Sequence, residues 1–502
     1  MDAVGASWDG PADPSRRRVR SAVFTVLAIG AVLSCYRVWA FRLSGLDLSV
    51  DEAQYWYWAQ HPAWGYFSKP PLLAWLIAAS TAVCGDGALC VKAPALVLYP
   101  VTAAGVCLVA MELYGRRAGI AAATAFLLLP GISLSAMIVS TDVPLLLCWT
   151  WAMLTLLLAD RTGRWRWWIA CGVIVGFGLL AKYTMLFFLV GAAGWMGRRL
   201  ISARPWVAAS IAVAIFGPHL LWNSESRYAT VQHTLHIAHW STLGTRLDLG
   251  ELGEFVVAQI GILGPMLALI AGALIVAGRP QAPAHGTRGD ATRLVVWFSL
   301  PLLGAMGLQA LFARANGNWA APAIVALTIW LVGEACTRGW RRSLRAGVML
   351  NAAVMLTAYH YHALAAVFDV ELTRRTDPYL RVEGWREAAA AVTRLRGQYP
   401  GVRLLADERD VLAQMAYQLR PGGLSIGTLG SAEAPRHHYD LVAAVDPASV
   451  NEALYLAHRD DAEPRLDALF CAVRELPPIS VRRTADASLR VHVYWLSADC
   501  RP

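Results

Sequence analysis

The sequence predicts a polytopic α-helical membrane protein with about eleven spanning helices and a carboxy-terminal α/β domain. The first reason is composition, because 57% of the 502 residues are hydrophobic and only 16% are charged, unlike a soluble domain. The second is that apolar runs of spanning length recur up to residue 367. The third is the net charge of +9, whose Arg residues lie in clusters between those runs. We interpret this charge as a signal of membrane orientation and expect no nucleic-acid partner.

Residues 1–21 are expected to form a basic amino terminus in the cytoplasm. An Arg-rich stretch at 16–20 precedes the first apolar run, and no small-residue cleavage site follows it. Basic residues beside a span favour the cytoplasmic side. The first run is therefore expected to remain as a membrane anchor.

Residues 22–367 form the predicted membrane domain. A hydrocarbon core needs roughly 20 apolar residues in a helix, fewer where neighbouring helices help. The qualifying runs lie near 22–41, 92–113, 118–139, 143–159, 167–181, 183–197, 206–222, 255–277, 294–312, 319–335 and 346–366. Dividing one long run at Lys182 and Tyr183 keeps the later basic loops on the cytoplasmic side. The basic loop residues on that side are Arg116, Arg117, Arg161, Arg164, Arg166, Arg198, Arg199, Arg204, Arg279, Arg288, Arg293, Arg338, Arg341, Arg342 and Arg345.

Residues 368–502 contain no further spanning run and are expected to form one α/β domain in the periplasm. Helical periodicity covers 385–395, and strand-like patterns cover 402–406, 441–445 and 491–496. On this outer side, Cys84 with Cys90 and Cys471 with Cys500 are candidate disulfide pairs. Free, partly buried thiols are the open alternative.

The first outer segment, residues 42–91, is the richest in candidate catalytic groups. Asp47, Asp51 and Glu52 follow the first span directly, where an acidic residue is costly unless it has a role. Ser49 and Glu52 fit an S-x-x-E capping box, which is the structural alternative to a catalytic Glu52. Asp51 would point about 100° away from Glu52 on a helix. It is the candidate general base, with stabilisation of the helix dipole as the alternative.

A dense aromatic group that includes Tyr55 and Tyr66 comes next. Such rings are typical of an interfacial belt, and beside carboxylates they could also line a sugar or lipid pocket. Pro70 and Pro71 favour the first turn of a helix, so residues 70–84 are predicted to form a short helix on the membrane surface. The amino end of this helix and the Lys69 ammonium would bind a phosphate, and a snorkelling lysine is the alternative.

Two ionisable residues stand at the outer ends of predicted spans, where charges are candidates for function. We expect Asp142 near a cation or an acceptor hydroxyl, and Lys182 near phosphate.

Two further outer segments contribute polar candidates. The loop 223–254 contains Asn223 and a histidine series of His233, His236 and His239. The spacing of this series allows metal binding, although hydrogen-bonded histidines are commoner. A tight turn with Arg314 and Asn318 is a candidate phosphate or sugar contact.

These segments together resemble the GT-C membrane glycosyltransferases. The resemblance is to the bacterial branch related to protein O-mannosyltransferases and to the aminoarabinose and galacturonic-acid transferases of lipid A. The matching pieces are DEAQYWYWAQH, GYFSKPPL, STDVPLLL, LLAKYTML, LLWN, EFVVAQIGILGP, NGNWAAPA, GWREAAAAV and RHHYDL, in family order over nearly the whole chain. The resemblance implies inverting transfer of a sugar from a polyprenyl-phosphate carrier to an acceptor at the outer face of the bacterial inner membrane.

The resemblance also implies roles for individual residues. The first-loop carboxylate of the family corresponds to Asp51, and its phosphate-binding lysine corresponds to Lys69. We expect Lys182 and Arg314 to help bind the phosphate, and Asp142 and Glu52 complete the catalytic candidates. The expected substrate contacts are Tyr55, Tyr66, Asn223, His233, Asn318 and His438. In the aminoarabinose-transferase branch a metal-linked acidic residue precedes the lysine, and here Ser68 stands there, so a divalent metal requirement stays open.

The sequence leaves the acceptor and part of the function open. The acceptor is expected to be lipid A or another envelope glycolipid, with a protein hydroxyl as the alternative. A transporter of lipid-linked sugars would share the spans and the phosphate site, but no internal repeat typical of transporters is evident. A scaffold whose tail binds a partner is a third, weaker interpretation.

Overall fold

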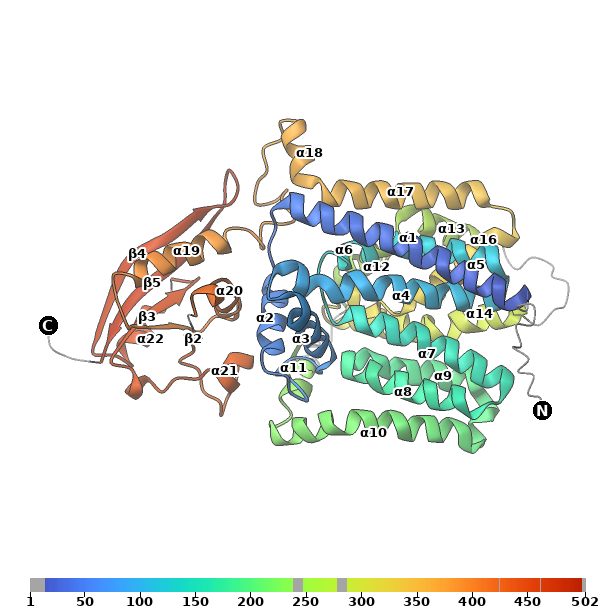
Figure 1. Cartoon of the computed structure of the whole chain (residues 1–502), viewed down its shortest axis with the longest axis horizontal. Coiled ribbons are helices and arrows are strands. Elements are labelled where there is room, and N and C mark those ends of the chain that lie inside the picture. The colour runs from blue at the N-terminus through green and yellow to red at the C-terminus, as the bar shows by residue number, and fades with distance from the viewer. Residues whose placement is uncertain (1–13, 238–246, 278–286, 424, 461, 499–502) are drawn as a thin grey trace, which may run out of the picture.

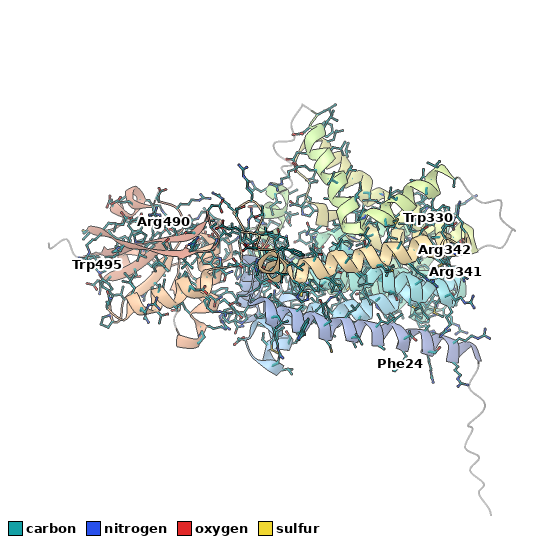
Figure 2. All side chains as sticks on the ribbon, turned by 90° about the horizontal axis from the view of Figure 1, so that it is seen from above. Phe24, Trp330, Arg341, Arg342, Arg490 and Trp495 are labelled. Atoms are coloured by element: carbon teal, nitrogen blue, oxygen red, sulfur yellow. A yellow bond between two sulfur atoms is a disulfide. The ribbon has the colours of Figure 1, made fainter. Side chains whose placement is uncertain are left out.

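The structure is a computed structural model that describes residues 14–237, 247–277, 287–423, 425–460 and 462–498. Figure 1 shows a bundle of roughly parallel helices with an α/β part docked at one end. Helix α1 (Pro14–Ser44) begins at the opposite end of the bundle. Figure 2 places Arg341 and Arg342 at that same remote end, whereas Arg490 lies in the α/β part. The structure thus separates a basic loop from the carboxy-terminal part, as the predicted orientation requires.

Five helical segments of the described residues are long and apolar enough to cross a membrane, and one bent pair would make a sixth. The membrane-spanning candidates are α1, α4 (Ala88–Tyr114), α7 (Asp142–Thr162), α10 (Ala203–Glu225) and Gly289–Phe312, which comprises most of α14 (Thr287–Phe298) and α15 (Leu300–Phe312). The sequence is therefore that of a multi-pass membrane protein, while the number of about eleven crossings stays a prediction.

The remaining predicted spans fall on shorter or broken helices. These are α5 (Arg116–Leu127), α6 (Pro130–Ser135), α8 (Trp165–Ala181), η1 (Tyr183–Met185), α9 (Leu186–Met196), α12 (Leu249–Leu263), α13 (Pro265–Val276), η4 (Gly317–Ala320), α16 (Ala323–Thr337), α17 (Arg341–Tyr359) and α18 (Tyr361–Val367). The sharpest break is the 105° bend between α12 and α13. It occurs at Gly264, whose φ of +90° lies in a region that only glycine enters easily, and Pro265 then starts the new helix.

Three short helices lie between the bundle and the α/β part (Figure 1). They are α2 (Val50–Ala59), α3 (Leu72–Cys84) and α11 (Ala229–Ile237), while η2 (Gly197–Ile201) joins α9 to α10. The prediction of a short helix over 70–84 is confirmed by α3. A disulfide joins Cys84 at the end of α3 to Cys90 in α4, which confirms that pairing. The other expected pair, Cys471 with Cys500, includes a residue outside the described part.

The α/β part contains a five-stranded mixed sheet in the order β2-β1-β3-β5-β4. Strand β1 pairs in parallel with β2 and β3, whereas β5 pairs antiparallel with β3 and β4. The elements are α19 (Trp385–Arg396), β1 (Arg403–Ala406), α20 (Arg409–Gln418), η5 (Arg420–Gly422), β2 (Ile426–Gly427), α21 (His438–Val442), η6 (Pro447–Ser449), β3 (Glu452–Ala457), α22 (Glu463–Asp467), β4 (Ala472–Arg482) and β5 (Ser488–Ser497).

Two strand predictions in this part need correction. The expected strand at 441–445 is wrong, because the chain there ends helix α21 and then forms only an isolated bridge from Ala444 to Thr428. The apolar run is half-buried to exposed, and Val442 at the end of the helix faces outward. The long strand β4 was not predicted, because Pro477 and Pro478 interrupt its pattern. The register shifts between Leu476 and Ile479, which accommodates the prolines in an edge strand.

Candidate active site

Helix α2 holds two adjacent carboxylates in different surroundings. The predicted capping box is confirmed, because the Ser49 N–H donates to Glu52 Oε2 at 2.9 Å and the Glu52 N–H donates to Ser49 Oγ at 3.4 Å. The other Glu52 oxygen accepts from Lys92 Nζ at 2.5 Å and from the Val139 N–H at 2.8 Å. Glu52 is only 1% exposed. Its contacts join α2 to α4 and to the segment before α7.

Asp51 points away from this junction and has a different partner. Its side chain is 61% exposed, and its Oδ1 accepts from Arg409 Nη1 at 2.6 Å. Arg409 is the first residue of α20 in the α/β part, and the same Nη1 also donates to Gln54 Oε1 at 3.2 Å. The carboxylate on α2 is therefore oriented by a cation from the carboxy-terminal part. It remains accessible for a proton-transfer role.

Asp142 joins two of the predicted site residues. It begins α7, where a carboxylate is stabilised by the helix dipole, and it is buried. Its Oδ1 accepts from Lys182 Nζ at 2.7 Å, and its Oδ2 accepts from Asn318 Nδ2 at 3.0 Å. The expectation that Asp142 lies near a cation is therefore met by Lys182. Three segments separated in the chain meet at this carboxylate.

Lys69 lies beside the same charged groups. Its pKa is lowered to about 8, chiefly because burial removes water from the ammonium, and the nearby Lys182 acts in the same direction. The negative charges of Asp142 and Asp51 raise the pKa of Lys69 and so offset part of this decrease. Among the described residues, Lys69 forms no ion pair of its own. A partly desolvated cation without a counterion can bind an anionic group strongly.

An aromatic cluster adjoins the charges. The Tyr66 ring stacks on Trp58 with 4.7 Å between centroids, and its hydroxyl donates to the Trp58 carbonyl at 3.0 Å. His438 of α21 meets the Tyr66 ring edge-on at 5.3 Å. Burial lowers the pKa of His438 to about 3, so the ring is neutral near pH 7. Tyr55 is buried against Trp58 at 5.2 Å. The predicted contacts Tyr55, Tyr66 and His438 thus share one packed group.

Two cavities adjoin these residues. The larger, of about 1550 Å³, lies between the first outer segment, α10, α11 and the α/β part. Its lining includes Tyr66, Phe67, Arg227, His233, Arg436 and His438. The smaller, of about 440 Å³, has an entirely apolar lining from α3, α4, α7 and α8. Its lining residues Leu72 and Pro144 lie within three residues of Lys69 and Asp142 in the chain.

The other predicted residues occupy varied positions. His233 packs on Phe67 at 5.0 Å, and burial followed by repulsion from Lys69 lowers its pKa to about 4. Asn223 is buried and donates to Tyr183 Oη at 3.2 Å, which gives it a structural contact inside the bundle. The Arg314 side chain is exposed and, among the described residues, forms no ion pair with the charged groups. His236 lines the larger cavity, while His239 lies outside the described residues.

Contacts from α19 and α20 hold the α/β part against the first outer segment. Asp47 Oδ2 accepts from Arg386 Nη2 at 2.8 Å and from Gln418 Nε2 at 2.9 Å. Gln414 donates to the Leu48 carbonyl at 2.9 Å. These bonds lie within four residues of Asp51 in the chain. They fix α20, and with it Arg409, over the candidate base.

Arg409 and Lys92 are site residues that the sequence did not single out. Arg409 stands among several acidic and basic residues of a soluble-looking domain, and no local pattern distinguishes it. Lys92 was expected only as the edge of a span. A buried lysine within an apolar helix demands a carboxylate partner, and this signal could have pointed to Glu52.

The arrangement places three cations and two carboxylates together at one end of the bundle. Lys69, Lys182 and Arg409 are the cations. Such a group can stabilise a phosphate as negative charge develops on it. An exposed carboxylate beside it can accept a proton from a hydroxyl. The chemistry that fits is group transfer away from a phosphate.

Comparison with known proteins gives consistent results. Residues 68–222 match the dolichyl-phosphate-mannose-protein mannosyltransferase family. The chain is 31% identical over 472 residues to the lipid A galacturonosyltransferase RgtD of Rhizobium johnstonii, covering 92% of this chain and 93% of the relative. It is 26% identical over 272 residues to the lipopolysaccharide core galacturonosyltransferase RgtB of the same organism, covering 47% of this chain and 53% of that protein.

The fold resembles that of ArnT from Cupriavidus metallidurans. The structure bound to undecaprenyl phosphate matches with a TM-score of 0.62 at 17% identity, over 96% of this chain and 99% of that one. The apo structure matches with a TM-score of 0.61 at 14% identity, over 94% and 98% of the two chains. At this identity the likeness shows a shared fold.

Proposed function

The chain belongs to the family of the lipid A galacturonosyltransferases, and from this premise we propose that it transfers a sugar from a polyprenyl-phosphate carrier to lipid A. It is a membrane glycosyltransferase with the GT-C fold, as the resemblance predicted. A protein acceptor and transport of the intact carrier are not favoured.

The observation that carries the proposed chemistry is the position of Lys69. This lysine lies beside Lys182 and Arg409, yet it has no ion pair of its own within the described residues. It also stands three residues before Leu72 in the chain, and Leu72 lines the apolar cavity. An amphiphilic carrier needs both features, because its phosphate must meet cations while its isoprenoid chain stays out of water. We assign Lys69 to the donor phosphate and the apolar cavity to the first part of the carrier chain.

Asp51 acts as the general base in the proposed reaction. It removes the proton from an acceptor hydroxyl, and the hydroxyl oxygen forms a bond to the anomeric carbon of the sugar. The bond from that carbon to the phosphate oxygen breaks at the same time, and polyprenyl phosphate leaves with the bonding electrons. Lys69 and Lys182 stabilise the charge on the leaving phosphate. Attack from the face opposite the phosphate inverts the anomeric configuration.

The larger cavity is the proposed acceptor site. Its lining contains Arg227 and Arg436, which suit the phosphates of lipid A, and aromatic side chains such as Phe67, which suit sugar rings. It opens between the bundle and the α/β part, where a membrane-embedded glycolipid can enter from the side. Asn318 and His233 border the charged groups and are assigned to substrate positioning.

Galacturonic acid is the proposed sugar. The relative RgtD transfers it to lipid A by name, and the sugar carries a carboxylate besides the carrier phosphate. Both bonds of Arg409 leave from Nη1, so Nη2 and Nε form no hydrogen bond within the described part of the chain. A guanidinium edge that remains open can bind a second carboxylate in a bidentate manner. We therefore assign Arg409 to the sugar carboxylate as well as to Asp51.

Replacing Arg409 with Gln is expected to lower kcat/KM by about 10–100-fold for a uronic-acid donor, the range for losing a charge-assisted hydrogen bond. A carrier with a neutral hexose should lose much less. The purified variant is assayed with both donors by mass spectrometry of the glycolipid product. Gln418→Ala is the matched control, because it removes a hydrogen bond from the same helix to Asp47 and leaves the bonds of Arg409 to Asp51 and Gln54 in place. Equal losses for both donors in Arg409→Gln would contradict the carboxylate role.

The remaining topological assignments are also proposals. With about eleven crossings, the amino terminus lies in the cytoplasm, residues 22–367 form the membrane domain, and the α/β domain of residues 368–502 lies in the periplasm of the inner membrane. The remote position of Arg341 and Arg342 in Figure 2 supports this orientation. The charged groups and both cavities then lie at the outer face, where lipid-linked sugars and lipid A meet.

The direct test is reconstitution of the full chain in lipid nanodiscs with polyprenyl-phosphate galacturonic acid and lipid A. The expected result is lipid A enlarged by one uronosyl group, with release of polyprenyl phosphate in equal amount. Movement of intact carrier across sealed vesicles without product would contradict the enzyme. Substitution of a peptide acceptor for lipid A tests the protein-acceptor alternative in the same assay.

A further inference from the structure

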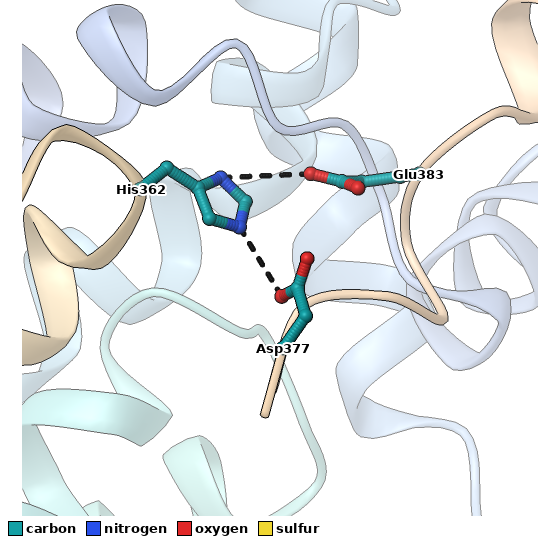
Figure 3. A group of neighbouring side chains, drawn as sticks. All are labelled: His362, Asp377 and Glu383. Carbon is teal, nitrogen blue, oxygen red and sulfur yellow. Dashed lines mark hydrogen bonds and ion pairs between the residues drawn. The ribbon is translucent and has the colours of Figure 1, made fainter. Parts of the chain in front are cut away.

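A second cluster of polar side chains lies away from the active site, where the last bundle helix joins the α/β part. Figure 3 shows His362 of α18 with one ring nitrogen toward Asp377 and the other toward Glu383, and both acids belong to the connecting segment 368–384. His362 Nε2 is 3.2 Å from Asp377 Oδ1, and His362 Nδ1 is 3.5 Å from Glu383 Oε1. Among the residues that the structure describes, this is the one group of three metal-ligating side chains whose ligand atoms lie within 4.8 Å of one another.

His362 has a carboxylate oxygen within 3.5 Å of each ring nitrogen. A neutral imidazole carries a proton on one nitrogen only, so it cannot donate to two carboxylates at once. The nitrogen without a proton would then face a carboxylate oxygen, and the lone pairs of these two acceptor atoms would repel each other. A metal ion bound by a ring nitrogen and by the carboxylate oxygens replaces this repulsion with attraction.

Besides His362, Arg483 is the cation that acts on Glu383, and no Lys or Arg forms an ion pair with Asp377 or Glu383 among the described residues. The Asp377 side chain is only 2% exposed, and it receives one neutral bond, from the Tyr379 N–H at 2.8 Å. Two carboxylates in partly desolvated positions are therefore compensated incompletely by the protein itself.

We propose that His362, Asp377 and Glu383 form a binding site for a divalent transition-metal ion, with zinc the best match. One imidazole nitrogen and two carboxylate oxygens are ligands that zinc accepts at about 2.0–2.2 Å. Two ligands at that distance around a tetrahedral ion lie about 3.4 Å apart, close to the 3.2 Å between His362 and Asp377. Glu383 is 27% exposed on a segment without regular structure, so its side chain can close the remaining gap.

The ion would have a structural task. It would tie α18, the end of the bundle, to the segment that leads into α19. Arg386 in the first turn of α19 binds Asp47, which stands four residues before the proposed base Asp51. The site therefore controls how firmly the α/β part is docked over the active site. This inference does not depend on the identity of the donor or the acceptor.

The test uses the full chain in detergent, stripped with a chelator and dialysed against micromolar Zn²⁺. Elemental analysis by mass spectrometry is expected to give about one equivalent of zinc per chain, lost in His362→Gln and weakened at least about tenfold in Glu383→Gln. His492→Gln is the matched control, because it removes a histidine that lies 3.4 Å from a single carboxylate, Glu475. His233→Gln tests whether the zinc lies near the active site.

A second measurement does not require a metal count. Trypsin can cut at Arg374 and Arg375 in the connecting segment, and bound zinc should slow this cleavage about fivefold in the wild type but not in His362→Gln. Absence of zinc binding by the wild type, or full retention of zinc by a folded His362→Gln variant, would overturn the proposal. Loss of zinc in His233→Gln with retention in His362→Gln would place the ion at the active site and overturn it too. Failure of the transfer assay would leave these readouts unaffected.

Discussion

Replacement of Lys69 by Met is expected to lower the rate of sugar transfer by about 10²–10³-fold, the usual loss for one donor that stabilises a developing anion. Met keeps most of the side-chain volume, so the aromatic and apolar surroundings stay packed. The charge removed is the one cation of the cluster without an ion pair in the described residues. The rate is measured with purified protein, a polyprenyl-phosphate sugar and lipid A.

The pH profile gives a sharper form of the same prediction. The pKa of Lys69 is about 8, below its ordinary value, so its positive charge is lost as the pH rises through 8. We expect kcat/KM of the wild type to fall over that range, because this parameter reports groups of the free enzyme. Lys69→Arg should lack this alkaline fall, since a guanidinium stays charged far beyond it.

Two results would contradict the role of Lys69. One is a Lys69→Met variant that transfers sugar at more than about half the wild-type rate, because one lost donor should cost at least tenfold. The other is an alkaline fall that persists unchanged in Lys69→Arg. Arg42→Ala serves as a control, because it removes an exposed cation at the end of α1. Arg314→Ala in the same assay decides the untested prediction that Arg314 binds the phosphate.

Asp51→Asn is expected to abolish most transfer, by about 10²–10⁴-fold in kcat, while the protein keeps its melting temperature. The amide cannot accept the proton of the acceptor hydroxyl, but it can still accept the hydrogen bond from Arg409. An exposed side chain contributes little to stability, so the two readouts separate chemistry from folding. Retained activity in a folded Asp51→Asn protein would remove the base assignment.

Glu52→Gln is the neighbouring comparison, with the opposite expectation. Glu52 is buried and bonded to Lys92, so the substitution leaves a buried ammonium without its counterion. Loss of one partner of a buried pair costs about 3–5 kcal/mol of folding free energy. We expect a clear fall in melting temperature, with transfer activity lost in proportion to the folded fraction. A fully stable but inactive Glu52→Gln protein would instead favour a catalytic Glu52.

Local sequence patterns correctly predicted several structural features of this protein. The capping box at Ser49 and Glu52, the short helix α3 and the Cys84–Cys90 pair all depend on residues that are neighbours in the chain, and each is found in the structure. The wrong prediction at 441–445 has the same origin, because a short apolar run has no periodicity long enough to separate a strand from the end of a helix.

The amino-acid sequence by itself determined that the chain is a multi-pass membrane protein. The length of an apolar segment and the charge of a loop are local properties, and they decide directly whether a segment enters the bilayer and on which side a loop stays. It also placed Asp51, Lys69, Asp142 and Lys182 among the functional candidates. Only the tertiary structure decided what each of them contacts. The Arg409–Asp51 pair joins residues 358 positions apart, and the Glu52–Lys92 pair joins residues 40 apart. Partners at such separations are chosen by how helices pack, and a single sequence carries no periodic signal for that choice.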